Sequence, residues 1–165
     1  MKTYIFLYHE SSFFEVDLVA YFMKTKGDVF ITSEKDKHIA TNEGVKVLSD
    51  LLIEEVNIDE IDVLIICGGN IENIADISKL YNLIQECNDK NAIIGGICAG
   101  RDIVTEALSV KKAEKTTVID DRIVLSPGNE YVDFALTVGK VADIYEDDED
   151  YEETVNYFKL FCDVG

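Results

Sequence analysis

The chain has 165 residues, enough for a sizeable core, and we expect a single domain over residues 1–165. Its formal net charge of −18 repels phosphate backbones and anionic lipids, which argues against nucleic-acid and membrane partners. No apolar run has the length of a membrane span, and the N-terminus has the pattern of a first strand rather than of a secretory signal. The expected location is therefore cytoplasmic.

In chain order, short apolar runs alternate with segments of helical period. Between residues 35 and 50 the pattern is mixed, with a turn at 42–44 and a short strand or hairpin arm at 45–48, and the acidic run 146–150 is expected to be a solvated loop or a helix start. The alternation predicts an α/β fold, a doubly wound and mostly parallel sheet with helices on both faces, as in a flavodoxin-like sandwich. Strands are expected at 4–8, 28–32, 62–67, 92–97, 116–120 and 122–126, and helices at 14–26, 77–88, 99–108, 130–144 and 151–162.

Cys98 lies in the most distinctive motif, Gly96-Ile97-Cys98-Ala99-Gly100, between a predicted central strand and a predicted helix. The form G-x-nucleophile-x-G is typical of a sharp turn with a strained backbone, where bulky neighbours would clash. The first amides of the following helix would favour the thiolate and lower the pKa of the thiol. The alternative is a buried cysteine beside glycines that only permit close packing. We interpret Cys98 as a reactive thiol on a nucleophile elbow.

A second glycine pair, Gly68-Gly69, ends the other predicted central strand, directly after Cys67. Two consecutive glycines let backbone amides approach a ligand closely, so they are candidates to stabilise an oxyanion. An ordinary tight turn would explain the same residues. If the two strands are neighbours, Cys67 lies near Cys98, and a regulatory disulfide between them is left open.

Two acids, Glu15 and Asp17, follow the first predicted strand. A protonated carboxyl at this place would donate a hydrogen bond to the thiolate of Cys98. Glu15 is also explained as an acid that favours a helix N-terminus. Asp17 lies in the first turn of a helix that is otherwise dominated by apolar residues, which makes it the stronger candidate.

Metal and cofactor sites are not indicated. The four cysteines form no CxxC pair, and only His9 and His38 offer nitrogen ligands, so we expect reduced thiols, no metal and no cofactor.

Three motifs together resemble the ThiJ/PfpI superfamily, the class I glutamine amidotransferase-like α/β fold whose members include the Parkinson-disease-associated protein and the PfpI intracellular protease. Their order and spacing fit over nearly the whole chain. The motifs are Asp62-Val63-Leu64-Ile65-Ile66-Cys67-Gly68-Gly69-Asn70, Ile94-Gly95-Gly96-Ile97-Cys98-Ala99-Gly100 and Val124-Leu125-Ser126-Pro127-Gly128-Asn129-Glu130-Tyr131-Val132-Asp133-Phe134-Ala135-Leu136.

The resemblance implies that Cys98 is the nucleophile or an oxidation-sensitive thiol. It implies that Gly69, with Gly68 and the backbone of Ala99, forms an oxyanion pocket. The family's acidic partner falls on Asp17 when the apolar residues around it are aligned, with Glu15 as the fallback. Most of the relatives compared have glutamate there, and one branch that hydrates isocyanides has aspartate. Because family members usually dimerise, the resemblance also implies a homodimer.

The chain departs from the family in its histidines. Protease-like and glyoxalase-like members place a histidine directly after the nucleophile or on a later strand, whereas here Ala99 follows Cys98 and no histidine follows His38. His9 is the one plausible substitute. Proteolysis and glutamine amide transfer, which need such a histidine as general acid–base, are therefore disfavoured.

Three functions remain open after this comparison. The first is a cofactor-free, cysteine-dependent hydrolase or lyase of a small electrophile, glyoxalase-like or hydratase-like. The second is a redox-responsive or stress-protective protein whose partner is an oxidant. The third is a pseudoenzyme that binds a small metabolite without catalysis.

Overall fold

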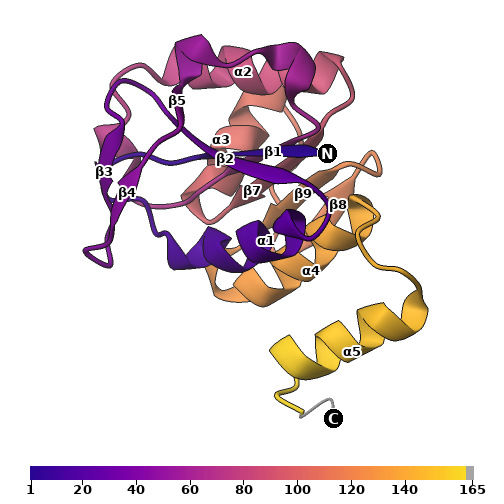
Figure 1. The fold of residues 1–165 in the computed structure, drawn as a ribbon. Helices are drawn as coiled ribbons and strands as arrows, with labels where there is room; N and C mark the ends of the chain where they lie inside the picture. The colour runs from indigo at the N-terminus through magenta and orange to yellow at the C-terminus, as the bar shows by residue number, and fades with distance from the viewer. Residues whose placement is uncertain (163–165) are drawn as a thin grey trace.

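A mostly parallel sheet forms the centre of the protein. The computed structural model describes residues 1–162. In that part of the chain the sheet has seven strands in the order β5-β2-β1-β6-β7-β9-β8, all parallel to their neighbours except β8, which runs antiparallel to β9 (Figure 1). The bounds of these strands are β1 Lys2–Phe6, β2 Asp28–Ser33, β5 Leu51–Leu52, β6 Val63–Ile66, β7 Ile93–Ile97, β8 Thr117–Ile119 and β9 Ile123–Ser126.

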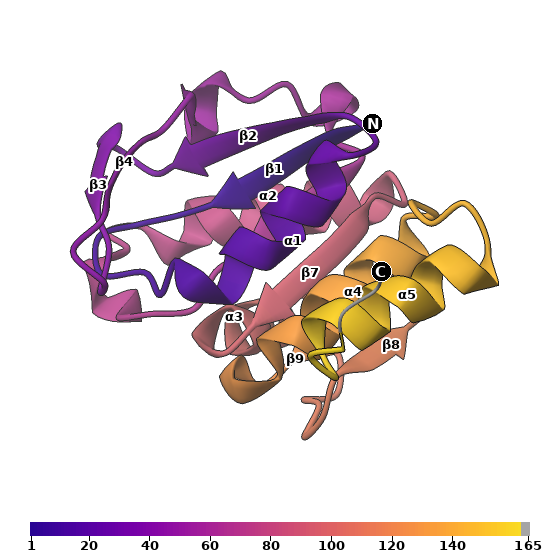
Figure 2. The ribbon, with the colours of Figure 1, turned by 60° about the horizontal axis from the view of Figure 1, so that its bottom comes forward.

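Helices cover both faces of this sheet. Figures 1 and 2 show α1 (Phe14–Lys24) and α4 (Tyr131–Val141) side by side on one face, and α2 (Ile77–Asp89) and α3 (Ala99–Leu108) on the other. The predicted doubly wound α/β architecture is thus confirmed. No helix within residues 1–162 combines the length and the apolarity that crossing a membrane requires.

The side chains of the central strand β6 show how the two cores form. Leu64 and Ile66 pack in the core under α2 and α3, while Val63 and Ile65 pack in the core under α1 and α4. All four are fully buried, since a parallel strand with both faces covered has no solvent side. This explains the unbroken β-branched and leucine run in the sequence.

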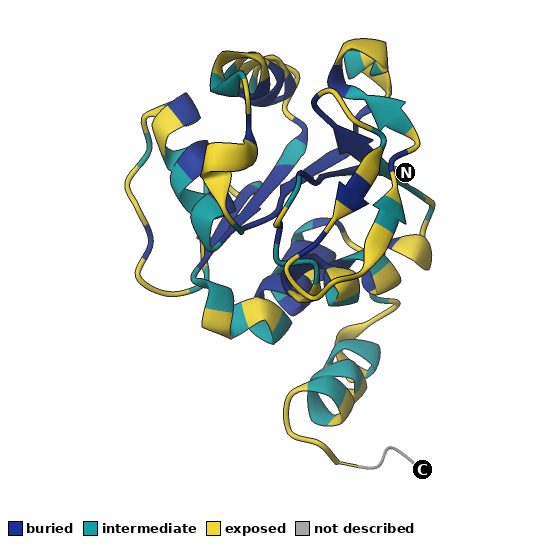
Figure 3. Cartoon of the chain, turned by 90° about the vertical axis from the view of Figure 1, so that its left-hand side faces the viewer, coloured by how far each residue is buried: buried dark blue, intermediate teal, exposed yellow. Residues whose placement is uncertain are grey.

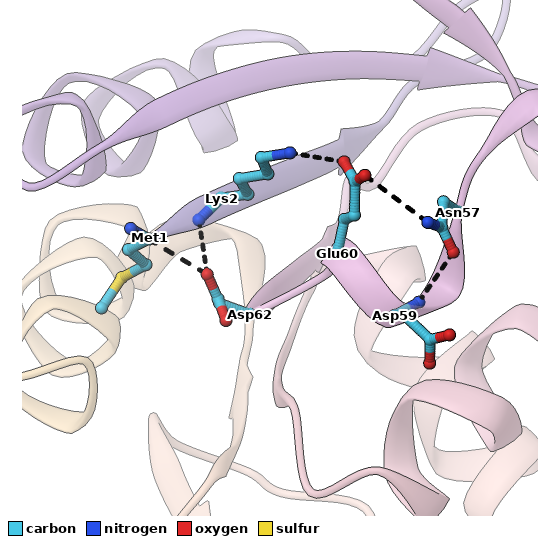
Figure 4. Close-up of polar contacts among 6 residues, drawn as sticks. All are labelled: Met1, Lys2, Asn57, Asp59, Glu60 and Asp62. Carbon is cyan, nitrogen blue, oxygen red and sulfur yellow. Dashed lines mark hydrogen bonds and ion pairs between the residues drawn. The ribbon is translucent and has the colours of Figure 1, made fainter.

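Polar contacts join the amino ends of β1 and β6 (Figure 4). The Lys2 amide donates to Asp62 Oδ2 at 2.7 Å, and the Lys2 ammonium pairs with Glu60. The Asn57 side-chain amide donates to Glu60 at 3.5 Å. These side chains are largely exposed, so each pair stabilises little. They lie at the amino ends of the strands. The glycine motifs lie at the other end of the sheet, at the carboxyl ends of β6 and β7.

A separate hairpin of β3 (His38–Ala40) and β4 (Lys46–Leu48) stands beyond the carboxyl ends of β1 and β2 (Figure 1). Its turn contains Gly44 in a left-handed conformation with φ +80°. The expected turn at 42–44 and hairpin arm at 45–48 are confirmed.

The C-terminal helices differ from their predicted bounds. The helix expected at 130–144 ends at Val141, because Asp143 adopts a left-handed conformation with φ 54°. The last helix, α5 (Asp148–Phe158), begins three residues before the expected start, because the Asp147 side chain accepts from the Asp150 amide at 2.9 Å and caps it. This helix has no buried residue, as its teal and yellow ribbon shows (Figure 3), and it packs on the body of the protein through Phe158, whose ring centroid lies 5.0 Å from that of Phe22.

The N-terminal half also differs in detail. The first strand spans residues 2–6 instead of 4–8, and β5 and the short 3-10 turns at Ile53–Glu55, Ile58–Glu60 and Ile71–Asn73 were not predicted. These pieces are two or three residues long, too short for a periodic pattern to reveal.

A close approach of α3 to β6 yields a first prediction. A Cβ on Gly100 would lie 2.1 Å from the Ile66 carbonyl oxygen, part of a central strand that cannot move cheaply. We expect Gly100→Ala to lower the free energy of unfolding by about 2 kcal/mol, measured by urea denaturation. Gly44→Ala is the control, since a Cβ there meets no atom within 4 Å and costs only the ~1 kcal/mol of a left-handed residue. Equal losses in both variants would contradict the packing argument.

Candidate active site

Cys98 occupies the turn between β7 and α3 in a strained conformation, φ 56° and ψ −121°. A left-handed φ at a residue other than glycine persists only where the surroundings hold it. Here the Cys98 amide donates to the Ser126 carbonyl at 3.0 Å, which ties the turn to β9. A Cβ on Gly96 would come within 2.8 Å of the Gly100 carbonyl oxygen, so the flanking glycines are required by the close packing of strand and helix. The thiol is half-buried.

The acid beside the Cys98 sulfur is Glu15, in the first turn of α1. Its side chain is buried, with 4% of the residue exposed, and its carboxyl and the Cys98 thiol line the same space. Two glycines make room for the pair. A Cβ on Gly68 would lie 2.3 Å from Glu15 Oε2, and a Cβ on Gly128 would lie 2.7 Å from Oε1 and 3.1 Å from the sulfur.

Asp17 and His9, two other candidates from the sequence, lie elsewhere. The preference for Asp17 as the contact of the thiol was wrong, because Asp17 is exposed and Glu15, two residues earlier on α1, turns inward. His9 Nδ1 accepts from the Ala40 amide at 3.3 Å, and its Nε2 faces Asp36 at 3.5 Å. These contacts bind His9 to the hairpin side of the molecule.

The glycine loop after β6 presents its two residues differently. Gly68 lies against the Cys98 side chain, and a Cβ on it would be 3.2 Å from the Ala99 amide nitrogen. Gly69 has φ +134° and packs on the backbone of Glu10 and Ser11, forming an isolated antiparallel bridge with Ser11. The structure therefore places Gly68 beside the Cys98 side chain and the Ala99 amide, with Gly69 one residue further along the same loop.

The pKa of both groups of the pair is raised. Burial raises the pKa of Glu15 most, while its hydrogen bonds with Cys98 and with the Gly68 amide lower it. Burial outweighs these lowering effects, so the pKa of Glu15 is raised overall. Burial is also the largest cause that raises the pKa of the Cys98 thiol, and the charge of Glu15 and the hydrogen bond with it raise the pKa further. The Ala99 amide and the charge of Arg101 lower the pKa of this thiol, but by less. The expectation of a lowered thiol pKa was thus wrong, because the helix N-terminus is outweighed by burial and a neighbouring carboxylate.

The other cysteines do not join the site as ligands or as a disulfide. All four are free, and the buried Cys67 donates to the Ser12 carbonyl at 3.2 Å. Within residues 1–162, no three histidine, cysteine, aspartate or glutamate side chains are grouped to hold a metal ion.

Several residues near the site were missed by the sequence analysis. Gly128 belongs to the third motif but was given no role at the site, although its position after a strand end is the signal that could have marked it. Arg101 follows the motif by one residue and is held by Asp102 and by the Ala113 carbonyl at 2.9 Å each. Tyr8 donates to the Cys67 carbonyl at 3.4 Å from the end of β1. Nothing in the local sequence marks Tyr8 as part of the site.

An α/β sheet with a cysteine on a strand-to-helix elbow, facing a glycine loop, defines a broad class of cysteine-elbow proteins. The model of the DJ-1/PfpI family matches residues 1–144, so the chain belongs to that family. The expected ThiJ/PfpI resemblance is confirmed.

Curated relatives and solved structures agree with this assignment. The chain is 28% identical to the deglycase PfpI of Pyrococcus furiosus over 135 residues, 78% of this chain and 80% of the relative. It is 28% identical over 81 residues to the DJ-1 homolog B of Arabidopsis thaliana, but this stretch is 48% of this chain and spans only 18% of that longer protein. A DJ-1 superfamily protein of Agrobacterium tumefaciens has the same fold, with a TM-score of 0.82 at 16% identity over 98% of this chain and 100% of the other. Oxidized DJ-1 of Toxoplasma gondii superposes with a TM-score of 0.76 at 20% identity, covering 94% and 96%.

The buried acid yields a second prediction, on stability. Since the pKa of Glu15 is raised above its ordinary value of 4.5, its ionisation costs stability above pH 4.5, and the cost vanishes at lower pH, where folded and unfolded states are both protonated. We expect Glu15→Gln to raise the free energy of unfolding at pH 8 by about 1 kcal/mol, because replacing a charged residue that is kept for function often stabilises a protein. The gain should disappear at pH 4, measured by urea denaturation. Asp17→Asn, on the exposed side of the same helix turn, should change little at either pH.

Proposed function

We propose that the protein is a cofactor-free, cysteine-dependent enzyme that acts on a small reactive carbonyl compound. The observation that carries this proposal is the contact of the Glu15 carboxyl with the Cys98 sulfur in the space left by Gly68 and Gly128. A nucleophile and a group able to hold its proton then lie at the same point. Two archaeal relatives, from Pyrococcus furiosus and Thermococcus kodakarensis, carry the name deglycase, which is consistent with carbonyl chemistry.

In the proposed reaction the Cys98 thiolate attacks an aldehyde carbon and a C–S bond forms. The carbonyl π electrons pass to oxygen, which takes the proton of the Glu15 carboxyl to give a hemithioacetal. The amides of Gly68, Gly69 and Ala99 are the candidate donors that stabilise the developing oxyanion. For methylglyoxal, Glu15, now a carboxylate, takes the proton from the former aldehyde carbon and delivers it to the neighbouring carbon, while the hydroxyl proton passes to the neighbouring oxygen. Water then hydrolyses the resulting thioester, which releases lactate and restores the Cys98 thiol. The net reaction is the addition of one water.

A histidine-dependent reaction is not proposed. His9 is engaged with Ala40 and Asp36, and the family's later histidine has no counterpart in this sequence. Proteolysis and glutamine amide transfer therefore lack their general acid–base. A hydratase-like reaction on an isocyanide would use the same sulfur and acid. The homodimer remains a prediction from the resemblance, and the cytoplasmic location remains a prediction from the sequence pattern.

The third prediction tests the proposed chemistry. With methylglyoxal as substrate, we expect Cys98→Ala to abolish the activity, because the nucleophile is lost. Glu15→Gln should lower kcat/KM by about 100-fold, the usual contribution of a general acid–base. Asp17→Asn is the matched control and should stay within about twofold. A parent rate no higher than that of Cys98→Ala, with glyoxal and an isocyanide as well, would contradict catalysis and favour a metabolite-binding pseudoenzyme.

A redox-responsive role is a second candidate, supported by the contrast among the cysteines. Burial raises the pKa of Cys67, and raises that of Cys87 to about 12, whereas Cys98 is half-buried beside an amide and a carboxyl that can hydrogen-bond an oxidised sulfur.

The fourth prediction follows from that contrast. Under graded peroxide, Cys98 should gain two oxygens, as a sulfinic acid, before Cys67 or Cys87 gains any, measured by intact mass and peptide mapping. The Cys162→Ser variant removes the exposed thiol as a competing reactant and should behave in the same way. Oxygen uptake at Cys67 or Cys87 ahead of Cys98 would rule out the sensor role.

A further inference from the structure

The β3–β4 hairpin is bound to the loop that leads into α1. The Glu10 amide donates to the Ala40 carbonyl at 2.8 Å, and the Asn42 amide donates to the Ser11 carbonyl at 3.0 Å. These backbone hydrogen bonds hold the hairpin turn against the start of α1.

The same loop is bound on its other side to the glycines near Cys98. The Ser12 amide donates to the Gly68 carbonyl at 3.0 Å, and the Asn70 amide donates to the Glu10 carbonyl at 3.0 Å, around the bridge between Ser11 and Gly69. The hairpin, the loop and the glycine pair are thus joined by backbone hydrogen bonds into one wall of the site.

Glu43, at the tip of this hairpin, contacts the N-terminus of α1. The residue before the helix, Phe13, supplies no side-chain cap, and the Phe14 amide donates instead to Glu43 Oε1 at 3.2 Å. Glu15 is the next residue along the helix. A side chain from a distant hairpin therefore satisfies the amide beside the buried acid.

Glu43 and Glu15 differ in how they hold a proton. Burial raises the pKa of Glu43, but hydrogen bonds, including those from the Phe14 and Phe13 amides, outweigh it and lower the pKa overall. The pKa of Glu15 is raised, in part by the charge of Glu43. Two carboxyls whose environments shift their pKa values in opposite directions are suited to different roles. Glu43 stays charged, and Glu15 is able to exchange a proton.

The other titratable groups that face Glu15 come from three elements. They are Tyr8 at the end of β1, Cys67 after β6 and Cys98 on the elbow. Tyr8 and Cys67 have raised pKa values and stay neutral near pH 7, so their effect on Glu15 is small. The charge of Arg101 lowers the pKa of the Cys98 thiol.

We propose that Glu43 is a positioning residue of this site, which fixes the first turn of α1 and keeps a negative charge beside Glu15, so that Glu15 carries the proton when Cys98 reacts as a thiolate. The inference rests on the proposed function for the meaning of that proton. The placement of the proton itself is measurable without any substrate.

The fifth prediction uses Glu43→Gln, which retains the oxygen that accepts from Phe14 and removes the charge. With ¹³C-labelled glutamate, the carboxyl titration of Glu15 should move to lower pH in the variant, with Glu15→Gln assigning the signal. In parallel, kcat/KM for methylglyoxal should fall about threefold on the alkaline side of the pH profile, the size of one exposed charge interaction, and stay unchanged on the acidic side.

Asp17→Asn is the matched control, since it removes one exposed charge from the same helix turn. An unshifted Glu15 titration in Glu43→Gln, or the same shift in Asp17→Asn, would overturn the inference. A merely structural role for Glu43 would change the thermal midpoint without moving the titration, and would also overturn it. A shifted titration in a protein without turnover would support the inference and contradict the proposed function.

Discussion

The contact between the Glu15 carboxyl and the Cys98 sulfur is the constraint on which the rest of the site depends. The two groups meet in a space that exists only because Gly68 and Gly128 have no side chains. Four segments from different parts of the chain converge there, and a Cβ on Gly68 or Gly128 would collide with the side chains of Glu15 and Cys98. The left-handed conformation of Cys98 is the local cost of this convergence, and strain of this kind is held by the surrounding fold.

Burying an acid next to a thiol sets the electrostatics of the site. Desolvation disfavours charge on both groups, so the pKa of each is raised. The amides of Ala99 and Gly68 act in the opposite sense, by stabilising negative charge on the sulfur and on the carboxyl. The helix N-terminus is therefore one contribution among several, and a motif alone gives the sign of its own contribution but not of the sum.

The comparisons separate what is shared from what is particular to this chain. Solved structures at 16% and 20% identity have the same fold, which shows that the architecture tolerates replacement of most side chains. Function depends on the few residues grafted onto that architecture. In this chain those residues include an acid and a thiol without a later histidine, and a hairpin whose Glu43 caps the helix that carries the acid.

The sequence by itself determined the doubly wound fold and the elbow at Cys98, because buried parallel strands need unbroken apolar runs and a sharp turn needs its glycines. It could not decide between Glu15 and Asp17, which both lie in the first turn of α1. Helix packing decided it, since α1 rests on the sheet with Glu15 inward and Asp17 outward. Nor could it find the contacts of Gly128, Tyr8 and Glu43 with the elbow, the end of β6 and the start of α1, respectively. Each of these contacts joins segments at least 29 residues apart in the sequence. The sign of the Cys98 pKa shift was likewise decided only by the tertiary structure, because it depends on burial and on a carboxylate brought in from another element.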